Sequence, residues 1–376
     1  MKNKIILLFL FILSYSAKAQ DMVVSSYFIG SDFRDSWIEL IVTKDNSNIK
    51  DWLLGDYEPN GGGHLNNYSS IKFKNKAIWT NLRGGTIILL YCRSLNSAGL
   101  ANLIDTNAED GFIAVHAQLT SFFDDCPATN DNKLKIHSSA DMITLKLLSH
   151  IHSLGHGTNN SNFNINGNPK LYNDQVGLGN RLIQACPAAN LAQYNNIKED
   201  TIATNMTALG LTQGLPNIRS GNLDSNLAYW LKLREPSWTA PILNISSNLG
   251  RTCDTLKWNV ASDLFPSDST QGYIILKSSN GLFPANPEDG TVYNLGSLIG
   301  GNPIIAIISN SQITSYTYTH ILDCNKIYYR VFAYRYKSDK INGNGYHRAR
   351  GRAYNQVNFA SGNSSSVNPI PILYHY

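Results

Sequence analysis

Three histidines within seven residues are the first candidates for chemistry in this sequence. His150, His152 and His156 lie in the segment SHIHSLGHG. If the segment begins as a strand, His150 and His152 point to the same face, about 6.5–7 Å apart, and His156 can fold back beyond a turn. Three imidazoles can bind zinc or copper. However, HExxH is absent and no nearby acidic residue completes a known metalloenzyme spacing, so a solvated edge strand is the favoured interpretation.

Oxygen-rich loops offer a second kind of metal site. One loop gathers carboxylates and carboxamides, namely Asp124, Asp125, Asn130, Asp131 and Asn132. Calcium needs several such oxygens converging within about 2.5 Å. The DxDxDG spacing of a calcium loop is missing, so ordinary solvated carboxylates are favoured. We therefore expect no cofactor, with calcium in this loop or zinc at the histidines as the alternatives.

Nucleophilic motifs are weak along the chain. GxSxG is absent. Cys92 lies in the apolar run TIILLYCR, where a small buried thiol is the simpler interpretation. The glycine-rich segment 61–64 is not followed by a Lys-Ser/Thr helix, so it does not predict a phosphate-binding loop. These patterns predict a protein that is not an enzyme.

A basic and aromatic stretch near the C-terminus is the candidate binding site. Its principal residues are Arg335, Tyr336, Arg348, Arg350 and Arg352. Basic side chains between aromatic rings are typical of contacts to nucleic acid or to an anionic polysaccharide, and such binding must weaken with salt. Alternation along an antiparallel strand pair gives the same pattern with no partner at all.

Five cysteines fit an oxidising compartment. Cys126 and Cys186 share a setting, Asp-Cys-Pro and Ala-Cys-Pro, and Cys253 and Cys324 each precede a strand pattern. We expect two bridges, Cys126–Cys186 and Cys253–Cys324, with Cys92 left over. Each bridge would close a loop of roughly 60–70 residues, worth about 3–4 kcal/mol in the entropy model. The connectivity itself cannot be read from the sequence.

The N-terminal segment predicts export. Residues 1–19 combine two early lysines, the apolar run IILLFLFIL and an Ala17-x-Ala19 cleavage site, so the mature chain begins at Gln20. The apolar run is too short to span a bilayer. No later stretch approaches 18 apolar residues, and we expect no transmembrane segment in the mature chain. The expected location is extracellular, at the cell surface or in the periplasm.

Composition narrows the possible classes. Charged residues are only 15% of the 376, while 28 Gly and 20 Tyr are present. The formal charge is +4, and removal of the three lysines of the export segment leaves +1. A strongly basic nucleic-acid binder and a long coiled coil are therefore both unfavoured, and turn and strand residues dominate.

The elements that must position these residues are short strands with no helical periodicity. In SWIELIVT one face is wholly aliphatic, and in KIYYRVFAYRY the residues Tyr329, Val331 and Ala333 share a face. Strands are predicted over 22–29, 36–43, 51–56, 71–73, 86–93, 110–117, 141–152, 253–260, 272–278, 303–309, 313–319 and 326–336. Such spacing predicts an all-β chain of sandwiches.

The first part of the chain resembles a known family. DSWIELIVTKDNSNIKDWLLGD, GGTIILLY and DMITLKLLSHIHSLGHG resemble the lamin-tail domain, over about 20–240. Long polar insertions around 121–136 and 157–210 depart from that family. The resemblance implies an immunoglobulin-like sandwich that binds or tethers. The export segment, ending in Ala-Gln, resembles those of Bacteroidetes secretory proteins.

The second part resembles a fibronectin type III domain, over 241–358. The carrying motifs are CDTLKWNV, GYIILKS and LDCNKIYYRVFAY, in which Tyr328 or Tyr329 is the candidate corner tyrosine. Residues 359–376 form a tail, either an added edge strand or a disordered end. The expected fold is thus two immunoglobulin-like β-sandwiches in series, with long loop insertions.

These observations predict a secreted or cell-surface protein for binding, adhesion or scaffolding, whose partner is another protein at the cell envelope. The alternative is an accessory polymer-binding role, on polysaccharide or DNA, in a secreted hydrolase system. Polysaccharide is the second choice of partner and nucleic acid the least favoured. Sandwich folds host too many functions for the fold alone to decide.

Overall fold

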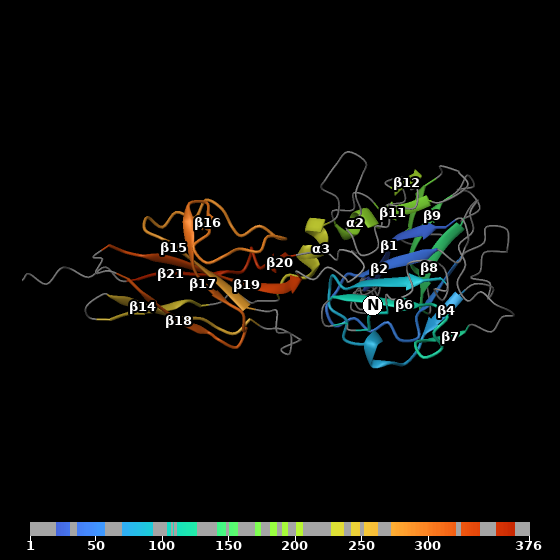
Figure 1. The fold of residues 1–376 in the computed structure, drawn as a ribbon, viewed down its shortest axis with the longest axis horizontal. Coiled ribbons are helices and arrows are strands. Elements are labelled where there is room, and N and C mark those ends of the chain that lie inside the picture. The colour runs from blue at the N-terminus through green and yellow to red at the C-terminus, as the bar shows by residue number, and fades with distance from the viewer. Residues whose placement is uncertain are drawn as a thin grey trace, which may run out of the picture. The chain divides into compact units, whose positions relative to one another are not determined.

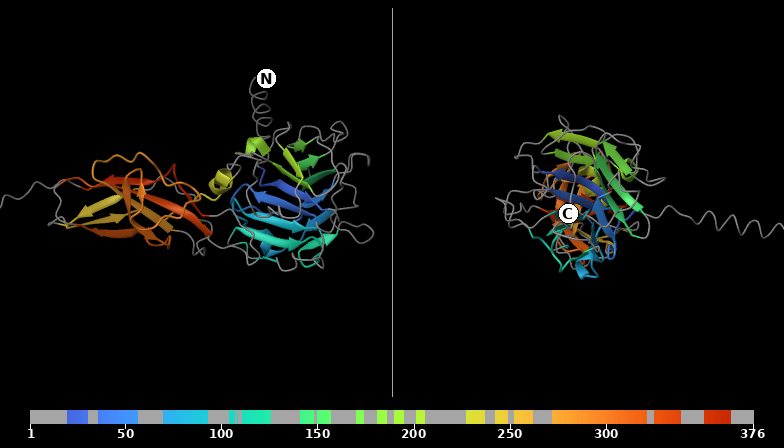
Figure 2. Two further views of the ribbon diagram at one scale, coloured as in Figure 1. Left: turned by 45° about the horizontal axis from the view of Figure 1, so that its top comes forward. Right: turned by 90° about the vertical axis from the view of Figure 1, so that its right-hand side faces the viewer.

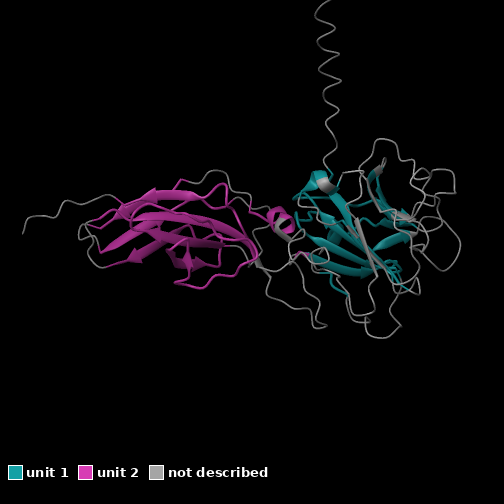
Figure 3. Ribbon diagram, turned by 90° about the horizontal axis from the view of Figure 1, so that it is seen from above, with its two compact units in different colours: residues 1–108, 112–211 teal, residues 109–111, 212–376 magenta. Residues whose placement is uncertain are grey.

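A computed structural model gives the structure of the protein (Figures 1 and 2). The residues it describes are 20–30, 36–56, 70–92, 104–106, 108, 111–125, 141–147, 150–156, 170–173, 181–185, 190–194, 201–205, 227–236, 242–248, 252–261, 272–320, 325–338 and 351–364. The chain divides into two compact units, coloured in Figure 3. Unit 1 comprises Met1–Ala108 and Phe112–Leu211, and unit 2 comprises Glu109–Gly111 and Thr212–Tyr376.

Unit 1 is built from two six-stranded sheets. The first has the order β12 (Thr201–Asn205), β11 (Arg181–Ala185), β1 (Met22–Ile29), β2 (Trp37–Val42), β5 (Ile87–Tyr91), β6 (Phe112–His116). The second has the order β10 (Lys170–Asn173), β9 (His150–His156), β8 (Asp141–Lys146), β3 (Leu53–Asp56), β4 (Ser70–Phe73), β7 (Phe123–Asp125). Two short helices accompany them, η2 (Ala77–Trp79) and α2 (Leu191–Tyr194).

The central strands of unit 1 are buried on both faces. Every residue of β1, β2 and β5 is buried. This explains their nearly continuous apolar sequences, since a strand covered on one face only would alternate with polar residues. Glu39 is the one charged residue in these three strands, and its carboxylate accepts a hydrogen bond from Ser26 Oγ at 3.2 Å.

The prediction of a single strand over 141–152 is wrong. The chain instead forms β8 and β9, which pair antiparallel with Lys146 opposite His150, so the direction reverses between these two residues. The intervening residues 147–149, Leu-Leu-Ser, include none of the Gly, Pro, Asn or Asp residues that usually form turns. The three histidines therefore lie on one strand, β9, rather than on either side of a turn.

Unit 2 consists of a three-stranded and a six-stranded sheet. The smaller sheet has the order β13 (Asn244–Ser247), β14 (Cys253–Lys257), β18 (Ser315–Thr319). The larger has the order β16 (Leu298–Ile299), β17 (Asn302–Ile308), β15 (Gly272–Ser278), β19 (Tyr328–Ser338), β20 (Gly351–Tyr354), and β21 (Ala360–Asn363) also pairs with β19. The helix α3 (Leu227–Leu233) belongs to this unit, ahead of the expected domain start at 241.

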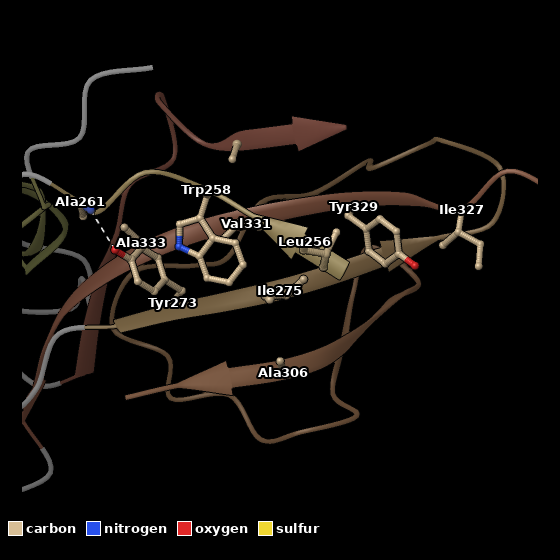
Figure 4. Packing of buried hydrophobic residues seen from close by; sticks show 11 residues of the cluster. Leu256, Trp258, Ala261, Tyr273, Ile275, Ala306, Ile327, Tyr329, Val331 and Ala333 are labelled. Atoms are coloured by element: carbon tan, nitrogen blue, oxygen red, sulfur yellow. Dashed lines mark hydrogen bonds between the residues drawn. The ribbon is translucent and has the colours of Figure 1, made fainter. Parts of the chain in front are cut away.

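The main core of unit 2 lies between its two sheets (Figure 4). Trp258 packs against Tyr273 with ring centroids 5.3 Å apart, and the Tyr273 hydroxyl accepts a hydrogen bond from the Ala261 N–H at 2.8 Å. The predicted shared face of β19 is confirmed, because Tyr329, Val331 and Ala333 are all buried in this core. Alternation along the strand is what places them there.

A second apolar layer covers the outer face of the larger sheet. Here Phe332 and Tyr334, the alternate residues of β19, pack with Ile274 and with side chains of the segment 279–302. The segment 279–302 is therefore an ordered third layer over the sheet. It contributes Ile299 to the buried cluster and packs the partly buried Phe283 and Tyr293 against it.

The prediction of an all-β chain is confirmed, and both units are sandwich-like in their arrangement of sheets. Within the described residues, no helix is long and apolar enough to cross a membrane. The export segment 1–19 and the last residues, 365–376, lie outside the described residues. Of the expected tail 359–376, Ala360–Asn363 forms the strand β21.

Candidate functional site

An arginine–aromatic layer on unit 2 is the most unusual group of side chains in the structure. Arg330 shares the outer face of β19 with Phe332 and Tyr334. Its guanidinium lies between two rings, 4.4 Å from the centroid of Phe283 and 4.5 Å from that of Phe359. Contacts of this kind attract a cation to the face of each ring, and burial lowers the pKa of Arg330. Arg330 thus fastens the segment 279–302 to the sheet.

A second arginine continues the layer on β20. The Arg352 guanidinium lies 4.3 Å from the centroid of the Tyr334 ring. Tyr354 neighbours both Tyr334 and Tyr293, with centroids 6.0 and 5.8 Å away, and its hydroxyl donates to the Thr291 carbonyl at 2.9 Å. Burial raises the pKa of both Tyr334 and Tyr354. These tyrosines therefore remain neutral donors.

Two carboxyl groups lie at the end of this layer. Asp289 Oδ1 accepts a hydrogen bond from the Tyr354 N–H at 2.8 Å, while burial raises the pKa of Asp289. Glu235 follows α3, and burial together with the nearby Asp289 charge raises its pKa to about 7, against the opposing effect of Lys232. A pair of partly buried like charges favours retention of a proton.

The Glu235 carboxyl sits where the chain after α3 meets β20. The next residue, Pro236, accepts a hydrogen bond through its carbonyl from Asn355 Nδ2 at 2.9 Å. Asn355 is itself fixed, because its N–H donates to the Ala333 carbonyl at 2.9 Å. The arrangement therefore ties α3 to the sheet beside a group whose charge changes near neutral pH.

Of the predicted binding residues, the structure places Arg352 in this layer. Arg335 and Arg352 are buried, with 0% and 4% of their surface exposed. Neither therefore offers its charge to a ligand at the surface of unit 2. Arg348, Arg350 and the side chain of Tyr336 lie outside the described residues.

His152 is a buried connector in unit 1. Its Nδ1 accepts a hydrogen bond from the Val24 N–H at 3.0 Å, and its Nε2 lies 2.7 Å from the Tyr194 carbonyl. The neutral imidazole with the proton on Nε2 fits both contacts. Both ring nitrogens are thus engaged, and a metal ion could bind here only by breaking one of these bonds. The side chains of His150 and His156 lie outside the described residues.

Of the other predicted ligands, the structure describes only the side chain of Asp124. Asp124 forms an ion pair with Lys74 at 3.0 Å, and the remaining oxygen donors of its loop lie outside the described side chains. In the part of the chain that the structure describes, no three His, Cys, Asp or Glu side chains are grouped to hold a metal ion.

The cysteine predictions are only partly covered by the structure. Cys92 is buried, as expected. Cys253 is a half-buried free thiol at the start of β14. Cys126, Cys186 and Cys324 lie outside the described residues. The two bridges, Cys126–Cys186 and Cys253–Cys324, therefore stay predictions.

A buried carboxylate in unit 2 was missed at the level of sequence. Asp254 is fully buried. Its Oδ2 accepts a hydrogen bond from the Tyr329 hydroxyl at 2.6 Å, and its Oδ1 accepts one from Ser247 Oγ at 2.5 Å. The signal was present in CDTLKWNV, because Asp254 shares the core-facing register with Leu256 and Trp258. An acid in that register predicts a buried, hydrogen-bonded carboxylate.

Comparison with known proteins assigns the chain to no family. A scan against protein-family models found no match, and no curated protein matched the chain. The resemblances to lamin-tail and fibronectin type III domains stay predictions, and the function must be argued from the residues of the chain.

Proposed function

We propose that this is an exported, non-catalytic binding or scaffolding protein, and that unit 2 contacts a protein partner through the segment 279–302. The observation that carries the proposal is the exposure of large apolar side chains on this ordered segment. Leu282, Leu295 and Leu298 expose 66–68% of their surface, and Val292 exposes 41%. Exposed apolar side chains gathered in one segment are typical of protein interaction sites.

Hydrogen bonds within unit 2 hold the segment 279–302 in place. Gly296 N–H donates to the Ile304 carbonyl at 2.9 Å, and Asn302 Nδ2 donates to the Leu282 carbonyl at 2.8 Å. Near the other end, Gly290 N–H donates to the Arg352 carbonyl at 2.9 Å. A segment ordered before binding loses less conformational entropy when the partner arrives, so its exposed leucines are suited to act as anchors.

A protein partner is favoured over a charged polymer. Polyanion binding depends on exposed cations and weakens steeply with salt, yet Arg335 and Arg352 are buried in unit 2. The predicted mature charge of +1 gives little long-range attraction for DNA or a sulfated polysaccharide. The predicted export segment and the predicted oxidising compartment support a partner at the cell envelope.

The test is affinity purification of the tagged full chain from the native envelope, with bound proteins identified by mass spectrometry. The parent is expected to retain a defined partner. The double variant Leu295→Ser, Leu298→Ser is expected to lose it. Val260→Ser, which changes an exposed apolar residue outside the segment (43% exposed), is the matched control and keeps the partner. Equal recovery by all three proteins, or no partner for the parent, would overturn the proposal.

A further inference from the structure

The strand β18 forms one edge of the three-stranded sheet of unit 2. Its backbone bonds to β14 through alternate residues, as shown by Trp258 N–H donating to the Thr314 carbonyl at 3.0 Å and His320 N–H donating to the Thr252 carbonyl at 2.8 Å. The intervening residues of an antiparallel strand direct both their N–H and C=O groups the other way. Ser315, Thr317 and Thr319 therefore point six backbone groups outward, and no described residue pairs with them.

This edge lacks the usual protection against pairing. Proteins normally blunt an edge with a charge, a proline or a bulge. The sequence Ser-Tyr-Thr-Tyr-Thr contains no charge and no proline, and its register with β14 runs without a shift. The side chains of Ser315, Thr317 and Thr319 are exposed. Figure 1 draws β18 at the margin of unit 2.

The sequence of β18 is almost symmetric about its centre. Antiparallel pairing with an identical strand, centred on Thr317, places Tyr316 opposite Tyr318 of the second copy and Ser315 opposite Thr319. In this register all three outward-pointing residues fall at hydrogen-bonded pairs, which gives six N–H···O bonds. We propose that a second copy of this chain pairs with β18 about a two-fold axis through Thr317, joining two three-stranded sheets into one of six strands.

The neighbouring side chains fit this partner. On the outer face, Thr317 Oγ1 lies 3.2 Å from Thr255 Oγ1, and Ser246 lies opposite Thr255, so pairing would continue a row of hydroxyls across the axis. Cross-strand hydroxyl pairs are favourable, whereas like charges opposite each other would not be. On the inner face, the Tyr316 hydroxyl donates to the Ile305 carbonyl at 2.9 Å, which holds the strand ready.

The test is sedimentation equilibrium of the purified full chain over a range of concentrations. The parent is expected to dimerise, and Thr317→Pro to weaken the dimer at least about tenfold, since it removes the central N–H donor from both copies. Within one chain that N–H faces outward, so no intrachain bond is lost. Thr317→Lys is the second variant, because it sets two like charges on the axis without altering the backbone.

The matched control is Val357→Lys, which adds the same charge to an exposed residue between β20 and β21, outside the three-stranded sheet. It is expected to dimerise within about threefold of the parent. A parent that stays monomeric to about 1 mM overturns the proposal. So does a dimer that Thr317→Lys and Val357→Lys weaken equally, because the contact would then lie elsewhere. Circular dichroism of each monomer checks that the fold is retained.

Discussion

At the scale of single residues, the same side-chain type can be a ligand or a structural connector, and its hydrogen bonds decide which. His152 lies in a histidine-rich segment that predicts a zinc or copper site as one alternative. In the structure its two ring nitrogens meet Val24 and Tyr194, which belong to other elements of unit 1. Nothing in the sequence near His152 identifies these contacts, because they come from 128 and 42 residues away.

We predict that His152→Ala destabilises unit 1 by about 2–4 kcal/mol, since two buried backbone groups lose their partner and a cavity is left. Denaturant unfolding of the full chain measures the loss, with and without added Zn²⁺. The effect is expected to be the same in both conditions. If Zn²⁺ instead stabilised the parent but neither His152→Ala nor His150→Ala, a metal site would be the better account of the segment.

Gly272 provides a second prediction at this scale. A Cβ atom at this position would lie 1.7 Å from the Ile308 carbonyl oxygen, a backbone atom that cannot turn away. Gly272→Ala is therefore expected to cost about 3 kcal/mol or more. Gly296→Ala is the control. A Cβ added at Gly296 would meet open space, and the only strain is that of a φ of +84°. This substitution should therefore lower the free energy of unfolding by about 1 kcal/mol. Equal losses in thermal unfolding would contradict this reasoning.

At the scale of elements, periodicity predicted the strands that are strongly apolar. The predictions for 22–29 and 272–278 coincide with β1 and β15, and alternation identified the core face of β19. The strand β13 was missed because it is polar, short and lies beside Asn- and Ser-rich sequence. For the segment that contains β21, an added edge strand was one of two alternatives left open. β13 pairs with the next strand, β14, whereas β21 pairs with the more distant β19, which local patterns do not report.

The packing of the segment 279–302 and of α3 could not be predicted from the sequence. The segment 279–302 is largely polar, yet a few of its aromatic residues fix it over the sheet through Arg330. Arg352 was predicted to belong to a basic binding stretch because the layer of side chains around it cannot be read from the local sequence. The perturbed carboxyl of Glu235 likewise depends on Asp289, which is 54 positions away along the printed sequence.

We predict that the attachment of α3 to unit 2 weakens as the pH rises. The folded protein holds the Glu235 proton more tightly than the unfolded chain, where the pKa is about 4.5. The resulting stability is complete below pH 4.5 and is lost as the pH rises through about 7. Because the carboxyl is partly exposed and screened, we expect only about 1–2 kcal/mol between pH 5 and pH 8.

Glu235→Gln tests this element directly, since a neutral amide has no proton to lose. Its free energy of unfolding is expected to fall less than that of the parent between pH 5 and pH 8. Glu288→Gln, which alters an exposed carboxylate beside Asp289, is the control and should follow the parent. A parent with no decline over this range would show that Glu235 is solvated and ionised.

At the scale of the whole molecule, the chain carries two separate sets of buried side chains. Unit 1 buries Trp37 and Trp79, whereas the core of unit 2 is built around Trp258 and Tyr273. Length and composition predicted more than one domain, because a single core rarely serves 376 residues. The place of α3 depends on contacts with β20 and was not predictable from the local sequence.

We therefore predict two transitions in calorimetric unfolding of the full chain. Gly272→Ala is expected to lower one midpoint by about 5 °C or more and leave the other unchanged, while His152→Ala does the reverse. The double variant should show both shifts with little coupling, because the two positions belong to different units with different cores. If either substitution moved both midpoints, or if one transition carried the whole enthalpy, the two cores would have to unfold as one cooperative structure.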